Sequence, residues 1–465
     1  MQAQPVIAII DVGKTNKKLF LLNEHYDIVL EQSEQFPEVQ DEDGFACEDV
    51  KLLTDWMKRI DQALSSHKEF ELKGINFSAY GASFVHLGND HNPVAPLYNY
   101  LKPYPEALAN HFYYHYGERS NFAVETASPI LGNLNSGLQL YWLKHEKPDT
   151  FNKITYSLHL PQYLSHLITG KSYSDITSIG CHTALWNFAT NDYHRWVYEE
   201  EIIPKLPALC KGNEVVFIEK ERKQIPVGVG LHDSSAALIP YLASFIEPFV
   251  LISTGTWCIS LNPFNQSPLT FDELQKDCLC YMTYHGKPVK ASRLFAGNEH
   301  EVQTKRLAAH FNVSTDYYKI VEYNPELIQQ IQQTNRGQAF LNINFKGGTE
   351  VSDFGSRYLN SFSSYEEAYH QLMLDIMAQQ LASTSLVLHN SEVKKIFVDG
   401  GFSKNAVYMN LLTAAFPGKE VYAASIAQAT SLGAALAIHQ HWNDLAIRSD
   451  LIELRYYADT RPLEF

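Results

Sequence analysis

Ala8-Ile9-Ile10-Asp11-Val12-Gly13-Lys14-Thr15, close to the start of the chain, is an apolar run that breaks into a polar turn around one glycine. Leu251-Ile252-Ser253-Thr254-Gly255-Thr256 repeats this pattern past the middle of the chain. Apolar residues resume after both turns, at residues 19–22 and 258–261. We therefore expect two β-hairpins. A glycine lets the backbone approach a ligand closely, and free backbone N–H groups with nearby hydroxyls suit phosphate oxygens, so the pair predicts two phosphate-holding turns.

The first turn also resembles the end of a P-loop, because Gly13-Lys14-Thr15 fits its last three positions. The first glycine of that motif would fall at Ala8, inside a continuous apolar strand, so no wide glycine loop can form and we reject this interpretation. Gly228-Val229-Gly230 lacks the third glycine of a dinucleotide fingerprint. Neither of the common nucleotide motifs is therefore present.

Composition sets the outer limits. The chain has 465 residues, of which 45% are hydrophobic, and this length favours two domains over one core. A net charge of −15 argues against nucleic acid as a partner. The six cysteines form no zinc or disulfide pattern and are typical of a reducing compartment. The start of the chain has no signal-peptide character and the apolar runs are strand-sized, so we expect a cytoplasmic protein without a membrane partner.

Strand-like runs alternate with amphipathic stretches, which is typical of the α/β class. We expect a domain boundary near residue 243, giving domains 1–243 and 244–465. The expected strands are residues 6–10, 18–22, 75–79, 84–87 and 395–398, and the expected helices are residues 50–64, 138–145, 161–167, 233–242 and 366–388.

Asp233 lies at the expected start of a helix, after the glycine-rich approach through Gly228 and Gly230. On position alone, an N-cap that only stabilises the helix is the more common role of such an aspartate. The small residues that follow, Ser234-Ser235-Ala236-Ala237, leave its carboxylate room to meet a substrate. Phosphoryl transfer asks little proton abstraction of its base, so an ionised, well-placed aspartate suffices.

A third motif is Phe397-Val398-Asp399-Gly400-Gly401-Phe402-Ser403-Lys404-Asn405, in which a strand ends in two glycines and a helix follows. An ordinary strand-to-helix turn has the same composition. We expect Ser403 to cap the helix, the glycines to let a base or phosphate lie on the backbone, and Asn405 to offer its amide. Residues 427–437 predict a helix with a face of small side chains, which more often packs closely against another helix than touches a ligand.

The order of these motifs resembles the FGGY carbohydrate kinases of the actin and Hsp70-like ATPase superfamily, and looks most similar to the rhamnulose and fuculose kinase branch. The similarity runs from Asp11 to Ala437. It implies two ribonuclease H-like domains with a catalytic cleft between them, an N-terminal sugar-binding domain and a C-terminal ATP-binding domain.

The resemblance also implies ATP and Mg²⁺ as cofactors and a role for each matched residue. Asp233 would be the general base and Asp11 would organise Mg²⁺. The β- and γ-phosphates would be held in the second domain by Thr254, Gly255 and Thr256. The first hairpin loop would also contact the phosphates, through Gly13, Lys14, Thr15 and Asn16. The adenosine would be contacted by Gly400, Gly401 and Asn405. For Lys14, a side chain that is simply solvated at the surface is an equally common interpretation.

The sugar side departs from the similar kinases. They carry an acidic residue where this chain has Ser83, and a Tyr-Arg-Asp element where it has Tyr100-Leu101-Lys102. The candidates for substrate contacts are Ser83, His159, Gln162, His182 and His232, although a structural role is the more common one for any single residue of this kind.

We therefore expect an ATP-dependent kinase that phosphorylates a hydroxyl of a ketose, deoxyketose or related polyol. One alternative is a degenerate sensor of the same fold that binds sugar or nucleotide without turnover. Another is an actin or Hsp70-like ATPase, against which the Leu167-Ile168-Thr169-Gly170 segment of the expected sugar domain speaks. The sequence leaves open the sugar, the hydroxyl that is phosphorylated and a homodimer.

Overall fold

The structure, a computed structural model, describes residues 3–333 and 352–458. These residues form two compact units. The first contains residues 3–245 together with Cys280–Pro288 and Ala427–Leu451, and the second contains the remaining described residues. The chain thus passes between the units more than once, so the units do not divide at a single point in the sequence.

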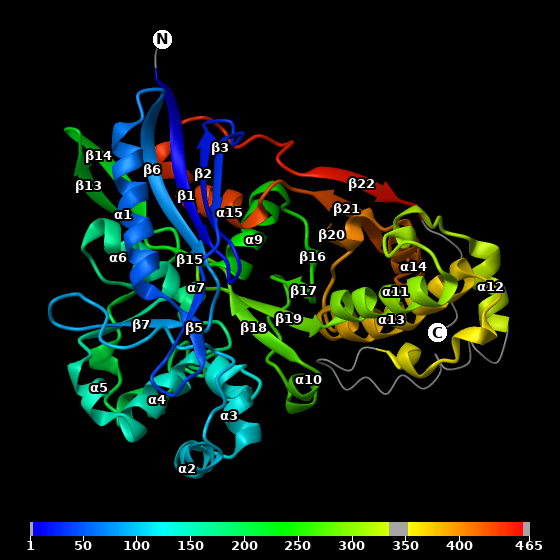
Figure 1. The fold of residues 1–465 in the computed structure, drawn as a ribbon, viewed down its shortest axis with the longest axis horizontal. Coiled ribbons are helices and arrows are strands. Elements are labelled where there is room, and N and C mark those ends of the chain that lie inside the picture. The colour runs from blue at the N-terminus through cyan, green and yellow to red at the C-terminus, as the bar shows by residue number, and fades with distance from the viewer. Residues whose placement is uncertain (1–2, 334–351, 459–465) are drawn as a thin grey trace. The chain divides into compact units, whose positions relative to one another are not determined.

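The first unit is built on one large sheet (Figure 1). Its central strand β1 (Gln4–Val12) is fully apolar from Val6 to Ile10 because both of its faces are covered, which explains the unbroken hydrophobic run. The sheet order is β13-β14-β6-β1-β2-β3, with β15 (Leu231–His232) beside β6. The other bounds are β2 (Lys17–Asn23), β3 (Ile28–Glu34), β6 (Phe70–Ala79), β13 (Val215–Lys220) and β14 (Lys223–Gly228).

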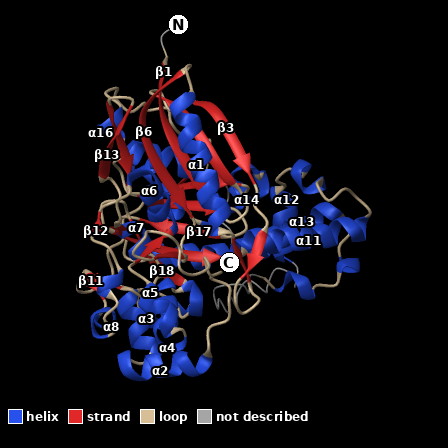
Figure 2. Ribbon diagram, turned by 60° about the vertical axis from the view of Figure 1, so that its left-hand side comes forward, coloured by secondary structure: helices blue, strands red, loops and turns tan. Residues whose placement is uncertain are grey.

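Helices cover the two faces of this sheet. On one face, alternate residues of β1 share a core with α1 (Val50–Ser66) and α6 (Leu160–Thr169), which lie beside the long strands in Figure 2. On the other face, Asn76 of β6 donates a hydrogen bond to the Ala434 carbonyl of α15 (Ala429–Ala437) at 2.7 Å. A Cβ on Gly433 of α15 would lie 1.9 Å from the Ala236 carbonyl oxygen of α9 (Asp233–Ser244). The small-residue face of α15 is therefore a close helix–helix contact, as expected.

The rest of the first unit is a second, largely helical core that contains Phe112, Tyr141 and Trp196. Its helices are α2 (Glu106–Tyr116), α3 (Arg119–Thr126), α4 (Ser136–Glu146), α5 (Pro148–Lys153), α7 (Ile176–Ile179) and α8 (Arg195–Glu199). The remaining short elements of this unit are β4 (Glu38–Gln40), β5 (Ala46–Glu48), β7 (Phe84–Leu87), β8 (Tyr156–His159), β9 (Ser174–Asp175), β10 (Trp186–Asn187), β11 (Asp192–Tyr193), β12 (Leu209–Cys210) and α16 (His439–Trp442).

A second sheet carries the second unit, in the order β18-β19-β17-β16-β20-β21-β22. Its strands are β16 (Phe249–Thr254), β17 (Cys258–Asn262), β18 (Cys278–Met282), β19 (Pro288–Leu294), β20 (Lys395–Gly400), β21 (Glu420–Ser425) and β22 (Glu453–Tyr457). The helices are α10 (Phe271–Gln275), α11 (Ala296–Phe311), α12 (Pro325–Gln333), α13 (Tyr365–Leu388) and α14 (Ala406–Ala415), with the short 3-10 helices η3 (Tyr317–Ile320) and η7 (Phe402–Lys404) among the turns.

The two hairpins occupy equivalent places in their sheets. In the first unit β1 pairs antiparallel with β2 and parallel with β6. In the second unit β16 pairs antiparallel with β17 and parallel with β20. Both predicted hairpins are confirmed, as are the α/β class and all the strands and helices expected from periodicity. Within residues 3–333 and 352–458, no helix is long and apolar enough to cross a bilayer.

Candidate functional site

The first hairpin closes through a four-residue loop, because Val12 pairs with Lys17. Gly13 N donates to Asn16 O at 2.9 Å and keeps this loop tight. Lys14 Nζ lies 3.3 Å from Glu38 and 5.8 Å from the ring centres of Tyr80 and Tyr100. The ammonium group is thus held near the loop, where it remains partly exposed. Among the other predicted phosphate contacts of this loop, Thr15 is exposed and Asn16 accepts a hydrogen bond from Gln35 at 2.9 Å.

Lys17, which was not among the predicted site residues, anchors this loop through hydrogen bonds to its backbone. Its side chain is buried, and Nζ donates to the carbonyl oxygens of Gly13 and Lys14, each at 3.1 Å. The charge is balanced by Glu48 Oε1 at 2.9 Å. The sequence does not distinguish Lys17 from its partly exposed neighbour Lys18, so this buried ion pair is visible only in the structure.

Asp11 lies one residue before the end of β1 and faces the first turn of α15. Its Oδ2 accepts hydrogen bonds from Thr430 Oγ1 at 2.7 Å and from Ser431 Oγ at 3.3 Å. Burial raises the pKa of Asp11 to about 6, the two hydroxyls oppose that shift, and the negative charge of Asp233 adds to it. The two predicted catalytic carboxylates, Asp11 and Asp233, thus interact electrostatically in the structure. Thr430 was not among the predicted site residues, because the helix over residues 427–437 was expected mainly to pack against another helix.

Asp233 is the first residue of α9 and not its N-cap. The cap position belongs to His232, which has extended backbone angles because it ends β15 in register with Ala79 of β6. Asp233 Oδ1 accepts a hydrogen bond from Ser234 N at 2.6 Å and lies 3.3 Å from His232 Nε2. Its side chain is about one-third exposed, with a relative accessibility of 35%. The carboxylate is therefore oriented through one oxygen and remains open to solvent.

His232 is itself tightly packed beneath Asp233. Its ring stacks on Tyr281 at a centroid distance of 5.6 Å and an interplanar angle of 24°. A Cβ on Gly81 would lie 2.7 Å from His232 Nε2, so the glycine gives the imidazole its space. His232 is 3% exposed, which favours a role in orienting Asp233 over direct contact with a substrate.

The other predicted substrate residues are also buried. Ser83 is 1% exposed, and its hydroxyl has no hydrogen-bond partner among the described residues. His159 is hydrogen-bonded to Ser136 at 2.9 Å, and burial lowers its pKa to about 3, so the ring is neutral. Gln162 Nε2 donates to Gly230 O at 2.9 Å, and His182 Nδ1 lies 2.8 Å from Cys181 Sγ. His159, Gln162 and His182 thus each have a structural partner.

Two residues of this chain, Leu101 and Lys102, differ from the Tyr-Arg-Asp element of the similar kinases, and they lie in different environments. Leu101 is 73% exposed. Lys102 is buried and forms ion pairs with Asp41 at 2.6 Å and Asp43 at 2.7 Å, so its charge is balanced within the first unit. The buried Lys102 therefore brings no unbalanced charge to this region.

In the second unit, the two glycines at the end of β20 have different roles. Gly400 has φ +77°, and a Cβ there would lie 1.8 Å from Thr254 O. Gly401 N donates to the same carbonyl at 2.9 Å. The Thr254 hydroxyl donates to the Asp399 carbonyl and accepts from Phe402 N at 3.0 Å. Thr254, predicted as a phosphate contact, thus braces the turn with its hydroxyl.

The helix after this turn is capped differently from the prediction. Ser403 lies in η7 and donates to Gly400 O at 2.8 Å, so it is not the cap. Asn405 is the N-cap of α14, and its Oδ1 accepts from Tyr408 N at 3.0 Å. Its Nδ2 donates to the Tyr369 hydroxyl at 2.7 Å. Both ends of the Asn405 amide thus have a protein partner, and its predicted contact with a nucleotide stays a prediction.

The tip of the second hairpin is pressed against the start of α11. Gly255 N donates to Trp257 O at 2.8 Å, and Asn298 N donates to Thr256 O at 3.1 Å. A Cβ on Gly297 would lie 1.8 Å from Gly255 O. These contacts place the predicted phosphate contacts Gly255 and Thr256 beside a helix N-terminus, where backbone N–H groups favour anions.

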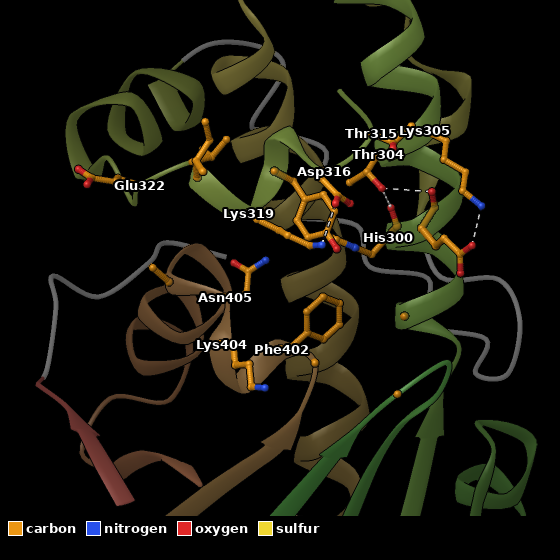
Figure 3. Close-up of a pocket in the computed structure, with 18 residues that line it drawn as sticks. His300, Thr304, Lys305, Thr315, Asp316, Lys319, Glu322, Phe402, Lys404 and Asn405 are labelled. Atoms are coloured by element: carbon orange, nitrogen blue, oxygen red, sulfur yellow. Dashed lines mark hydrogen bonds and ion pairs between the residues drawn. The ribbon is translucent and has the colours of Figure 1, made fainter. Parts of the chain in front are cut away.

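A cavity of about 1060 Å³ opens beside this tip (Figure 3). Three of the predicted nucleotide residues line it, namely Gly255, Gly401 and Asn405. A Cβ at Gly255 or Gly401 would meet no atom within 4 Å, so their backbones are bare toward this space. Sequence reasoning missed the wall supplied by α11 and η3, which includes Gly297, His300, Thr304, Tyr318 and Lys319.

Two of the cations around the cavity are neutralised locally. Lys305 pairs with Glu301 at 2.6 Å and Lys319 with Asp316 at 3.0 Å, as the dashed lines in Figure 3 mark. Lys404 also lines the cavity, and among the described residues no ion-pair partner is found for it. Of the three described lysines that line the cavity, Lys404 is therefore the one available for an anionic ligand group.

Comparison with known proteins decides the family. Residues 6–240 match the N-terminal domain of the FGGY family of carbohydrate kinases, and residues 246–445 match the carbohydrate kinase FGGY C-terminal domain. The chain belongs to the FGGY family of carbohydrate kinases. The resemblance inferred from the order of motifs is confirmed.

Two curated sugar kinases match at low identity. L-fuculokinase of Escherichia coli (strain K12) is 23% identical over 279 residues, which cover 55% of this chain and 56% of the relative. Rhamnulokinase of Halalkalibacterium halodurans is 24% identical over 263 residues, covering 53% of this chain and 52% of the relative. The matched part spans about half the length of these relatives.

Solved structures of carbohydrate kinases match over nearly the whole chain. A carbohydrate kinase from Novosphingobium aromaticivorans has a TM-score of 0.79 at 21% identity and covers 99% of this chain and 95% of its own. Ligand-bound xylulose kinase from Lactobacillus acidophilus has a TM-score of 0.76 at 17% identity, with 99% and 94% covered. The two-domain α/β fold of sugar kinases is therefore confirmed.

The residues present fit the cofactors that an FGGY kinase implies. A nucleotide suits the large cavity with two bare glycines. In the described part of the chain no cluster of three or more histidine, cysteine or acidic side chains could hold a metal ion by itself. Mg²⁺ commonly uses one or two carboxylates together with nucleotide phosphates and water, and Asp11 offers such a carboxylate.

Proposed function

We propose that this FGGY kinase transfers the γ-phosphoryl group of Mg-ATP to a hydroxyl of a ketose, deoxyketose or related polyol. The observation that carries the proposal is the setting of Asp233, a partly exposed carboxylate at the start of α9 whose charge acts on Asp11. Burial and the charge of Asp233 both make the ionised form of Asp11 costly unless it serves a cation or a proton.

Asp233 would accept the proton of the attacking hydroxyl. Ser234 N and His232 Nε2 contact its Oδ1, which leaves Oδ2 for the acceptor. The N-terminal end of α9, where Asp233 lies, carries a partial positive charge that attracts the carboxylate. Because little proton transfer is needed in the transition state, orientation matters more than basicity.

ATP would occupy the cavity of the second unit. Gly401 and Gly255 leave room for direct contact with the backbone, and Gly255 lies at the hairpin tip beside the first turn of α11. Lys404 offers a cation without a partner among the described residues. Asp11 would hold the Mg²⁺ that accompanies the phosphates, supported by Thr430 and Ser431.

The acceptor class rests on chemistry and on the relatives. L-fuculokinase and rhamnulokinase carry the names of deoxyketose kinases, which favours such sugars as the first candidates. In the first unit the cations Lys17 and Lys102 are buried in ion pairs, and Lys14 is paired with Glu38. This balance suits a neutral sugar better than an acid. The cytoplasmic location and the homodimer stay predictions.

The decisive experiment is a screen of ketoses, deoxyketoses and polyols with Mg-ATP in a coupled ADP assay. We expect ADP release that requires one acceptor class, and a loss of about 10³-fold in kcat for Asp233→Ala with ATP binding retained. Asp149→Ala, at an exposed aspartate in the first turn of α5, is the matched control and should be fully active. If ADP were released as fast without sugar as with it, the proposed transfer to a sugar hydroxyl would be contradicted.

A further inference from the structure

A chain of hydrogen bonds runs behind one wall of the cavity in the second unit. Asn405 Nδ2 donates to the Tyr369 hydroxyl at 2.7 Å, and that hydroxyl lies 3.0 Å from His300 Nε2. Tyr369 is fully buried on α13, whereas Asn405 and His300 line the cavity. Figure 3 shows Asn405 and His300 projecting from different elements, the start of α14 and α11. The chain therefore joins two sides of one site.

The direction of each hydrogen bond follows from its donors and acceptors. Tyr408 N is a donor and fixes the Asn405 oxygen on the helix side, so the amide NH₂ group faces Tyr369. The Tyr369 oxygen accepts that bond and has one proton of its own to donate. Among the described residues His300 Nε2 is the acceptor within reach of it. His300 then accepts at Nε2 and carries its own proton on Nδ1.

The His300 ring cannot easily turn away from this arrangement. It meets Phe402 and Tyr318 edge to face, at centroid distances of 5.2 and 4.8 Å. Burial lowers the pKa of His300 to about 4, so the ring is neutral near pH 7. A neutral histidine in this tautomer presents a hydrogen-bond donor and no charge.

The donor atom remains free for a ligand. His300 is 8% exposed, and no described residue forms a hydrogen bond with its Nδ1. Nδ1 is not among the buried polar atoms that lack both a partner and contact with solvent. Because His300 lines the cavity, the access that remains to Nδ1 is from the cavity side. The Nδ1–H donor of His300 thus faces a cavity in which a ligand can bind.

We propose that His300 Nδ1–H donates a hydrogen bond to the nucleoside part of the bound nucleotide, to either a ring nitrogen of the base or a ribose oxygen. Asn405 and Tyr369 are positioning residues that keep His300 in this donor form. The inference rests on the proposed function, since it takes the cavity to be the nucleotide site. It makes His300 a specificity-determining residue that the order of sequence motifs does not reveal.

Calorimetric titration of the whole protein with ADP, without sugar, tests the contact. His300→Phe keeps a ring of similar size and removes the donor, and should weaken ADP binding by about tenfold. His300→Gln, which retains an N–H donor, should recover part of that loss. His310→Phe, at an exposed histidine near the end of the same helix, is the matched control and should bind ADP as the wild type does.

The tautomer has its own readout, because nitrogen-15 spectra distinguish Nδ1–H from Nε2–H histidine. The wild-type signal that disappears in His300→Phe should report Nδ1–H, and Tyr369→Phe should shift it toward the other tautomer and weaken ADP binding several-fold. A melting curve for each variant separates this effect from misfolding. An Nε2–H signal in the folded wild type would overturn the proposal even if a variant failed to fold.

Nucleotide analogues locate the acceptor. If the acceptor is a base nitrogen, the penalty of His300→Phe should vanish for 1-deaza-ADP, 3-deaza-ADP or 7-deaza-ADP. If it is a ribose oxygen, the penalty should vanish for 2′-deoxy-ADP or 3′-deoxy-ADP. Equal ADP affinity of wild type and His300→Phe, or an unchanged penalty with every analogue, contradicts the inference alone. A wild type that binds no ADP would instead overturn the nucleotide site of the proposed function.

Discussion

Thr430 Oγ1 donates a hydrogen bond to Asp11 Oδ2 at 2.7 Å, although the two residues lie 419 positions apart in the chain. Thr430→Val keeps the shape of the side chain and removes this donor, which stabilises the ionised carboxylate. We expect the pKa of Asp11 to rise further and kcat to fall by about tenfold, because a hydrogen bond to a charged group is lost. Ser431→Ala, which removes a longer contact of 3.3 Å, should cost less. Equal kcat values for wild type and Thr430→Val would contradict this role.

Asp11 should also make the stability of the protein depend on pH. Its folded pKa of about 6 lies above the ordinary 3.8, so between pH 4 and 6 the folded state binds more protons than the unfolded state. The contribution of Asp11 to stability therefore falls as pH rises through this window, by up to about 3 kcal/mol. Asp11→Asn lacks this effect. Urea unfolding without nucleotide or Mg²⁺ should show Asp11→Asn gaining on the wild type from pH 4 to 7, whereas a constant difference would refute the assignment.

The sequence predicted the framework of both units well, because their hairpins depend on local signals. A buried apolar run, a glycine and a second apolar run suffice to define the hairpins that begin with β1 and β16. The helix start at Asp233 was also predicted, although the cap is His232. That difference of one residue comes from the pairing of β15 with β6, which no local pattern records.

What the sequence could not give are the contacts that join distant segments. The partners of Asp11 lie on α15, and the wall of the cavity comes from α11 and η3. The Asn405 amide was predicted to contact a ligand because the motif that contains it can be recognised in the sequence. One of its partners in the structure is Tyr369, a buried residue near the start of α13, where the sequence indicates only a core side chain.

The Gly-Gly turn allows a matched pair of substitutions. Gly400→Ala places a Cβ 1.8 Å from Thr254 O in a residue with φ +77°, so it should lower the free energy of unfolding by at least about 2 kcal/mol. Gly401→Ala meets no atom within 4 Å and should leave the melting temperature nearly unchanged while it weakens ATP binding. Differential scanning calorimetry and nucleotide titration measure the two effects. If ATP affinity were the same in Gly401→Ala and wild type, Gly401 would not belong to the site.

Lys17 and Glu48 form a buried pair, with side chains 2% and 6% exposed, directly under the first hairpin loop. Lys17→Met would leave Glu48 buried without its partner and release the carbonyls of Gly13 and Lys14, so it should cost about 3–5 kcal/mol in the free energy of unfolding. Replacing both residues, as Lys17→Met with Glu48→Met, should restore much of that stability, because no isolated charge is left behind. The loop would still lack its two anchors, so the KM for ATP should stay raised in the stable double variant. Urea unfolding and steady-state kinetics separate the two roles of Lys17, and a double variant with a normal KM for ATP would limit its role to balancing charge.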